Sequence, residues 1–206
     1  MKKYLKLVLC ALIFVFVFSA CASSKTPQQT VENMLKYVKK LDFDKAQKYL
    51  LNEDLGIDKE KLSSLGTEGE IIKSLLKNMS YKVISVENID ENTKTVNVKL
   101  ETFDIKALMS DFVPVVLSHT IDAMQVLGSG EKTDPGTLIT KDFNDLMKNE
   151  KYSGVEKLVD IKVINVGGKW KIDIGEPLIR FLYNDVNEMF DQLEEELKRI
   201  QVNIND

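Results

Sequence analysis

The sequence predicts an α+β fold, in which helices come first and two pairs of antiparallel strands follow, separated by a helical insertion. Two changes in pattern carry this prediction. Apolar residues lie about 3.6 apart before residue 80 and alternate with polar residues after it. The alternation stops near residue 102 and returns near residue 159, ahead of a last helical stretch. Residues 26–206 are therefore expected to form a single α+β domain, with the N-terminal helices packed on the sheet.

The first helix is expected to begin at Thr26-Pro27-Gln28-Gln29. The threonine supplies a capping hydroxyl, proline suits the first helical position, and the last glutamine completes a capping box. Asp42 is placed to cap a second, short helix. A third helical region follows, with a weak point at Gly66 and Gly69. The first helix is predicted to bury one stripe of apolar residues at helical spacing: Val31, Met34, Leu35, Val38 and Leu41. The later helices carry further apolar residues: Phe43, Ala46, Tyr49, Leu50, Leu62, Leu65, Ile71, Ile72, Leu75, Leu76 and Met79.

The strands are predicted from alternation. Residues 81–89 are rich in β-forming side chains, and after a polar turn the alternation continues over residues 96–101. The second pair covers residues 159–174, and Gly167-Gly168 between its arms favours a tight hairpin turn. Trp170 is expected to face the packed side of the sheet, and its loss would cost about 3–5 kcal/mol if the side chain is buried.

Between the strand pairs, residues 105–152 are predicted to form a helical insertion. Apolar residues recur through it at helical spacing, and Pro114 is expected to break or kink the first helix. A glycine-rich loop at residues 128–136 precedes a further helix. After Pro177, the pattern predicts a long C-terminal helix over residues 177–201.

The extreme N-terminus has the order of a secretory signal peptide. Three lysines precede an apolar run from Leu7 to Phe18, and small residues follow. A dozen residues cover only ~18 Å as a helix, less than the ~30 Å of a bilayer core. Removal of residues 1–20, which hold three lysines and no acid, would change the formal net charge from −4 to −7.

The next residue gives this segment a more specific meaning. Phe18-Ser19-Ala20-Cys21 resembles the lipobox of bacterial lipoproteins, although Phe18 replaces the usual leucine. The resemblance implies cleavage after Ala20 and a diacylglycerol on the thiol of Cys21. Residues 21–25 would then form a short lipidated tether. The implied location is the extracytoplasmic face of a cell membrane, where the lipid on Cys21 is the membrane partner.

The charge and the cysteines exclude several classes of protein. An acidic balance argues against a nucleic-acid partner and against polybasic attachment to anionic lipid. Cys10 lies in the signal segment and Cys21 is the lipid site, so the remaining chain has no thiol for a disulfide or a nucleophile. With only one histidine besides, the sequence points to no metal site and no cofactor.

Two segments resemble lipoproteins with the nuclear-transport-factor-2-like (cystatin-like α+β) fold, many of which contain a domain of unknown function. They are Asp42-Phe43-Asp44-Lys45-Ala46-Gln47-Lys48-Tyr49-Leu50 and Gly167-Gly168-Lys169-Trp170-Lys171-Ile172-Asp173. The resemblance implies helices packed on a curved antiparallel sheet that can form a cone-shaped pocket. The insertion and the terminal helix depart from the compact family, and both are placed to cover or fill such a pocket.

Candidate chemistry is sparse. His119 is the only histidine, and Asp122 lies one helical turn beyond it. The two residues allow two interpretations: a catalytic acid–base pair, or a plain surface or capping role. Glu87, Asp90 and Glu91 offer oxygen ligands, but they lack the spacing of a calcium loop and fit a solvated turn.

The apolar residues of the insertion have three possible roles: core beneath the sheet, the lining of a hydrophobic pocket, or contact with the membrane. Met109 and Phe112 are the residues expected to line a pocket, if one exists. The sequence therefore favours a non-enzymatic module that binds a hydrophobic ligand or an envelope protein. The alternatives are an enzyme of the same fold that acts on a small hydrophobic substrate through His119, and a structural component of an envelope assembly.

Overall fold

The computed structural model describes residues 25–126, 135–175, 178–182 and 195. Within them the fold is α+β, as predicted, with a four-stranded antiparallel sheet and helices before, within and after it. The signal segment, Cys21, the first four tether residues and the predicted C-terminal helix beyond Leu182 lie outside the described residues. Of that terminal helix the structure describes α8, Leu178–Leu182.

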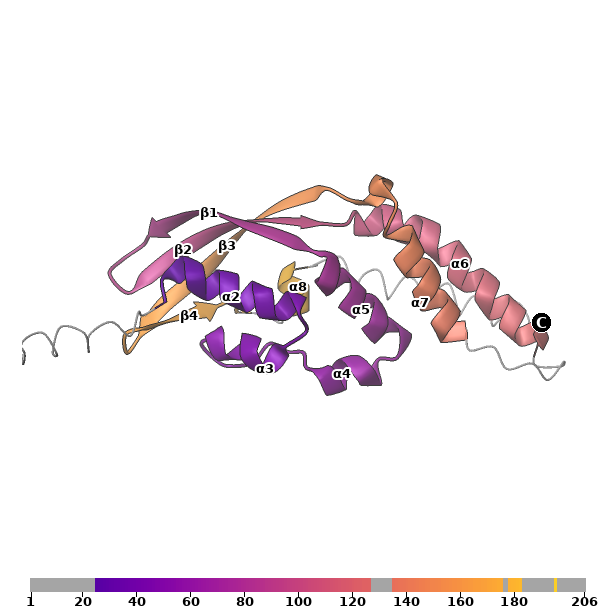
Figure 1. The fold of residues 1–206 in the computed structure, drawn as a ribbon, viewed down its shortest axis with the longest axis horizontal. Helices are drawn as coiled ribbons and strands as arrows, with labels where there is room; N and C mark the ends of the chain where they lie inside the picture. The colour runs from indigo at the N-terminus through magenta and orange to yellow at the C-terminus, as the bar shows by residue number, and fades with distance from the viewer. Residues whose placement is uncertain (1–24, 127–134, 176–177, 183–194, 196–206) are drawn as a thin grey trace, which may run out of the picture.

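The N-terminal helices lie on one face of the sheet (Figure 1). Helix α2, Pro27–Lys39, begins with the predicted capping box: the Gln29 N–H donates to Thr26 Oγ1 at 3.2 Å, and the Thr26 N–H donates to Gln29 Oε1 at 3.1 Å. Helix α3, Phe43–Ala46, leads into a 3-10 turn, η1, Gln47–Tyr49. Asp42 occupies the N-cap position of α3, as predicted, but its side chain makes no capping hydrogen bond. The carboxylate pairs instead with the Lys45 ammonium at 2.6 Å.

The predicted weak point separates two helices, α4 (Lys59–Ser64) and α5 (Thr67–Asn78). Gly66 turns the chain between them with a φ of 57°, a conformation that glycine adopts without a steric cost. Gly69 serves another purpose. A Cβ at this position would lie 1.8 Å from the Leu62 carbonyl oxygen, so the missing side chain lets α5 pack directly against the α4 backbone.

The sheet has the order β1-β2-β3-β4, and every neighbouring pair is antiparallel. Its strands are β1 (Ser80–Asn88), β2 (Thr93–Thr102), β3 (Val155–Val166) and β4 (Lys169–Asp173). Gly167 and Gly168 have φ values of 60° and 81°, which confirms the predicted glycine turn between β3 and β4. Inward-facing residues of the central strands are opposite one another, as Val98 is to Val159.

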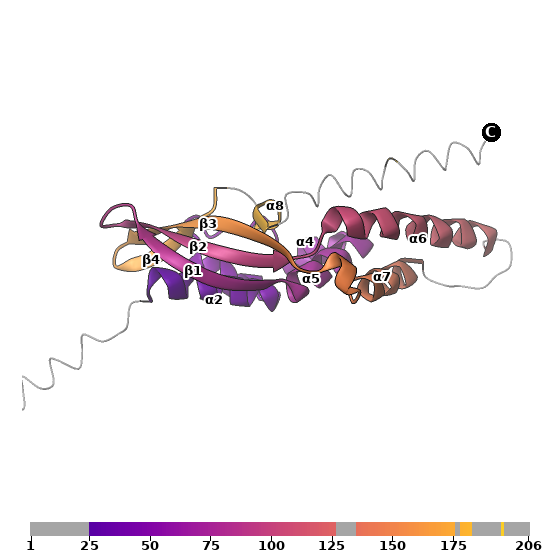
Figure 2. The ribbon, with the colours of Figure 1, turned by 90° about the horizontal axis from the view of Figure 1, so that it is seen from above.

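The insertion leaves the sheet at one end and returns to it (Figures 1 and 2). It consists of α6 (Ile105–Val126), α7 (Pro135–Leu146) and a 3-10 turn, η2 (Glu150–Tyr152). Pro114 was expected to break or kink the first helix, and it does not break it, because α6 continues through this residue. A backbone hydrogen bond joins the two ends of the insertion: the Asp104 N–H donates to the Tyr152 carbonyl at 2.8 Å, which brings β3 back beside β2.

The core joins all these elements. Its largest fully buried side chains come from the N-terminal helices, from the segment between η1 and α4, from the residue before β1 and from the insertion: Phe43, Phe112, Phe143, Met34, Leu35, Leu50, Leu55, Leu62, Ile71, Leu75, Leu76 and Met79. Among the described residues, no helix is long and apolar enough to cross a membrane.

Candidate functional site

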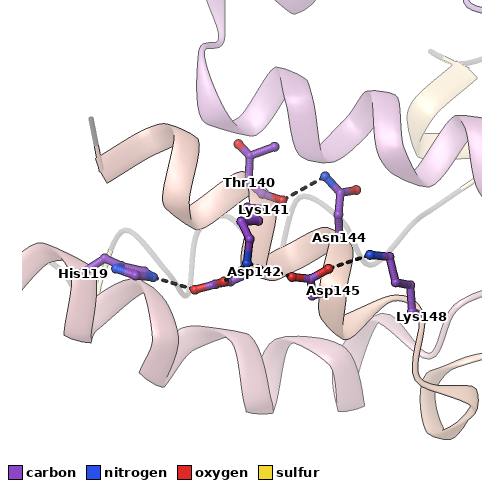
Figure 3. Close-up of polar contacts among 7 residues, drawn as sticks. All are labelled: His119, Thr140, Lys141, Asp142, Asn144, Asp145 and Lys148. Atoms are coloured by element: carbon purple, nitrogen blue, oxygen red, sulfur yellow. Dashed lines mark hydrogen bonds and ion pairs between the residues drawn. The ribbon is translucent and has the colours of Figure 1, made fainter. Parts of the chain in front are cut away.

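His119 lies on α6 and finds its partner on α7. Its Nε2 is 2.6 Å from Asp142 Oδ2, and both side chains are partly exposed (Figure 3). The sequence had suggested Asp122, which is exposed in the structure. The observed contact crosses between two helices, so it ties α7 to α6. A pair of this kind at a partly exposed position contributes at most ~1 kcal/mol.

The residues around this pair form further charge contacts along α7. Asp145 accepts from Lys148 at 2.6 Å and from Lys141 at 3.0 Å (Figure 3). The hydrogen bond from Lys148, followed by that from Lys141, lowers the pKa of Asp145. The same kind of pairing is found near the base of the insertion, where Asp111 accepts from Lys151 at 2.6 Å.

Met109 and Phe112, the expected pocket residues, are part of the core. Phe112 has no exposed surface and Met109 is 6% exposed. The Phe112 ring packs edge-on against Phe143 of α7, with the ring centroids 4.9 Å apart. Phe112 is therefore buried by the packing of α6 on α7, and neither residue lines the surface pocket described below.

The acidic turn has a structural explanation as well. Asp90 accepts a hydrogen bond from the Asn92 N–H at 2.7 Å, which shapes the turn between β1 and β2. This bond, followed by one from the Thr93 side chain, lowers the pKa of Asp90. In the part of the chain that the structure describes, no group of three histidine, cysteine or acidic residues is arranged to hold a metal ion.

A surface pocket of about 740 Å³ is lined by residues of α2, of α3 and η1, and of the β3–β4 hairpin. In Figure 1 this hairpin lies at the opposite end of the sheet from the insertion. We call this surface pocket the basic–aromatic pocket, because five lysines and three large aromatic residues line it. Its lining is Lys25, Thr30, Tyr37, Lys45, Lys48, Tyr49, Gly167, Gly168, Lys169, Trp170 and Lys171.

Two distant segments form the pocket because they pair along the backbone. Leu50, just after η1, forms a parallel bridge with Ile172 of β4, and the Leu51 N–H donates to the Ile172 carbonyl at 2.8 Å. Lys171 reinforces the contact by donating to the Lys48 carbonyl at 2.8 Å and to Glu53 at 2.9 Å. The glycine turn before β4 then projects Lys169 and Trp170 beside η1.

Aromatic rings make up the apolar part of the pocket. Tyr37 of α2 stacks with Tyr49 of η1 at 6.0 Å between centroids and an angle of 26°. The Lys25 ammonium lies 4.5 Å from the Tyr49 centroid and donates to the Tyr49 hydroxyl. Trp170 is half-buried and packs against the core. The predicted burial of Trp170 is therefore only partly confirmed, because the side chain also lines the pocket.

The charges of the pocket are unevenly compensated. Lys45 pairs with Asp42 at 2.6 Å and Lys171 with Glu53 at 2.9 Å. Within the described part of the chain, the ammonium groups of Lys48 and Lys169 make no hydrogen bond or ion pair, and both side chains are exposed. No aspartate or glutamate is among the residues that line the pocket. Such a site attracts an anion, and the rings offer a flat apolar surface next to it.

Reasoning from the sequence did not identify this pocket. Its two sides lie in the segments quoted for the family resemblance, residues 42–50 and 167–173, which were used only as markers of the fold. A usable signal was present, because each segment places two lysines close to an aromatic residue: Lys45 and Lys48 precede Tyr49, and Lys169 and Lys171 flank Trp170. Each cluster alone is typical of a solvated surface, and only their contact in the fold makes a site.

Comparisons of the chain with protein-family models, curated proteins and solved structures find no significant match.

Proposed function

We propose that this chain is a membrane-anchored extracytoplasmic lipoprotein that acts as a non-enzymatic binding module, and that it binds its ligand in the basic–aromatic pocket. The observation that carries the proposal is the lining: five lysines and three aromatic rings around about 740 Å³, with no carboxylate among the lining residues. In a chain whose formal net charge is −4, this concentration of positive charge is local and specific to the pocket.

The lining defines the chemistry of the ligand. Lysines act as point charges and bind phosphate, sulfate or carboxylate groups. The rings of Tyr37, Tyr49 and Trp170 favour a flat or apolar part next to that anionic group. The proposed ligand is thus amphipathic and anionic, which refines the hydrophobic ligand expected from the sequence. The lining contains no histidine or carboxylate to serve as a general acid or base, so binding is favoured over catalysis.

The membrane anchor is supported by the sequence around Cys21. The apolar run ending at Phe18 and the small residues before the cysteine have the order of a lipoprotein signal. Two acyl chains on Cys21 hold a protein at a membrane where one chain is marginal. The proposal places the domain on the outer face of the cell membrane.

We also propose that the domain is nuclear-transport-factor-2-like, with a long C-terminal helix over residues 177–201. The order of elements supports this, because short helices precede the antiparallel sheet and a glycine hairpin joins its last two strands. The basic–aromatic pocket differs in position from a cavity beneath the sheet, where the buried β2 side chains of Val96, Val98 and Leu100 are packed as core.

The binding proposal is tested with an anionic aromatic probe, anilinonaphthalene sulfonate, and with its uncharged analogue, phenylnaphthylamine. Trp170 is the only tryptophan, so energy transfer from tryptophan to the probe reports on this pocket. The protein is the mature chain with Cys21→Ser, which removes the lipid and keeps every described residue. We expect transfer to the sulfonate and much weaker transfer to the uncharged analogue.

A matched pair of variants gives the control. Lys48→Ala with Lys169→Ala is expected to weaken sulfonate binding about tenfold, since two charge contacts are lost. Lys77→Ala with Lys106→Ala removes the same charge from exposed positions outside the pocket and is expected to leave binding unchanged. Equal binding of the two probes, or equal loss in both double variants, would contradict the proposed site.

The anchor has its own test. Cys21→Ser in the full-length chain is expected to abolish acylation and membrane retention, measured by lipid labelling and detergent partitioning. Unchanged labelling of this variant would refute the lipoprotein proposal and leave the pocket proposal standing.

A further inference from the structure

The basic–aromatic pocket lies next to the proposed lipid anchor. Lys25 lines the pocket and comes four residues after Cys21. Four residues of fully extended chain span at most about 14 Å. If Cys21 is acylated, as proposed above, this length confines the pocket to the neighbourhood of the membrane surface. The inference below therefore rests on the proposed function.

The charge distribution fits a membrane surface at this end of the molecule. Bacterial and other cell membranes carry anionic lipids, which attract lysines and repel carboxylates near the surface. Lys25, Lys48 and Lys169 are exposed at the pocket, while the chain as a whole is acidic. The tether thus brings to the membrane the end of the protein that carries a lysine-lined pocket without acidic lining residues.

The aromatic residues fit the same location. Tryptophan and tyrosine favour the interface between water and lipid, because their rings are apolar and carry one polar group. Tyr37, Tyr49 and Trp170 lie among the lysines of the pocket, which places flat apolar surface beside the anion-binding charges. The glycerol and phosphate of a lipid headgroup would meet both kinds of surface.

We infer that the basic–aromatic pocket binds the phosphate headgroup of an anionic lipid in the membrane that holds the anchor. Because the tether keeps the pocket and the lipid together, a high effective concentration lets a weak site be occupied. Occupancy would also orient the protein. The insertion α6–α7 extends from the far end of the sheet, so a docked pocket directs this hairpin away from the membrane (Figure 1).

The test uses the mature acylated protein in vesicles that contain a phosphatidylcholine brominated close to the headgroup, a short-range quencher of tryptophan. One set of vesicles is otherwise phosphatidylcholine, and the other also contains phosphatidylglycerol. We expect stronger quenching of Trp170 in the phosphatidylglycerol vesicles. Lys48→Ala with Lys169→Ala should lower the ratio of docked to undocked protein about 30-fold, the factor expected for two lysines at an anionic surface.

The control double variant, Lys77→Ala with Lys106→Ala, is expected to retain the response to phosphatidylglycerol. Equal Trp170 quenching in both kinds of vesicle would overturn the inference, and so would quenching that survives loss of Lys48 and Lys169. Soluble glycerol phosphate, added to the phosphatidylcholine vesicles, separates the sources of phosphate. A change in Trp170 emission with glycerol phosphate but none with phosphatidylglycerol would overturn the lipid inference and support a soluble ligand. If neither changes the emission, the lipid inference fails, and the sulfonate experiment above separately decides the pocket proposal.

Discussion

Charged side chains are paired differently at the two ends of this molecule. At the α6–α7 end, acidic residues have close basic partners: Asp111 lies 2.6 Å from Lys151, Asp142 lies 2.6 Å from His119, and Asp145 lies 2.6 Å from Lys148. At the α2 and β3–β4 end, five lysines line one pocket and none of its lining residues is acidic. The acidic residues of the first arrangement are already paired. In the second, Asp42 and Glu53 lie beside Lys45 and Lys171, whereas the exposed Lys48 and Lys169 have no acidic partner among the described residues and would be balanced by a bound anion.

The comparison shows which cluster is informative about function. Lys25, Lys45 and Lys171 have contacts within the fold. The exposed Lys48 and Lys169 have no such partner among the described residues and add like charge beside the aromatic rings, so we explain them best by what they bind. His119, which the sequence suggested as a catalytic candidate with Asp122, pairs with Asp142 instead, and this contact joins α6 to α7. The following experiments test this division between a stabilising end and a binding end.

The largest effect on stability is expected from Phe112→Ala at the insertion end. Phe112 is fully buried against Phe143, so truncation should lower the free energy of unfolding by about 3–5 kcal/mol. Chemical denaturation measures this change. Leu158→Ala is the control, because this side chain is 74% exposed and its loss should cost less than about 0.5 kcal/mol. Sulfonate binding by the folded Phe112 variant should match that of the parent protein.

Trp170→Ala is expected to separate the contribution of this side chain to stability from its contribution to the proposed binding. Because the ring is half-buried, the free energy of unfolding should fall by about 2 kcal/mol, less than for Phe112. Binding of the anionic probe, followed by calorimetry since the tryptophan is lost, should weaken at the same time. A stability loss as large as that of Phe112→Ala would show that Trp170 is chiefly a core residue.

His119→Ala tests the structural explanation of the helix pair. We expect a loss of at most ~1 kcal/mol, and a double-mutant cycle with Asp142→Ala should yield a coupling of the same size. Binding in the pocket should not change, because His119 is not among its lining residues. A loss of binding on this substitution would support the alternative in which His119 acts on a bound substrate.

The smallest effect concerns pH. The hydrogen bond from Lys151, and next that from Tyr152, lowers the pKa of Asp111 below its ordinary value of 3.8. A carboxyl group with a depressed folded-state pKa stabilises the protein above its unfolded pKa and loses this contribution as the pH falls through the folded value. The difference in melting temperature between pH 6 and pH 3 should therefore be smaller in Asp111→Asn than in the parent. An identical difference would show that the contact has no influence on folding.

Local patterns predicted most of the elements. The capping box at Thr26, the break at Gly66 and the glycine turn at Gly167-Gly168 were recognisable because each depends on a few consecutive residues. Two local predictions were confirmed only in part. Helix α6 runs through Pro114 without a break, and Asp42 stands at the N-cap of α3 but uses its carboxylate for an ion pair with Lys45.

The sequence by itself determined the α+β class, the positions of the strand pairs, and the order of charge and apolar residues that predicts an anchor at Cys21. Only the tertiary structure decided that Asp142 is the partner of His119, that Phe112 belongs to the core, and that Tyr49 and Trp170 share one pocket. The physical reason is the range of the interactions. Helix periods and turns are fixed by neighbours along the chain, whereas the Leu50–Ile172 bridge that assembles the pocket joins residues more than a hundred positions apart and depends on the completed sheet.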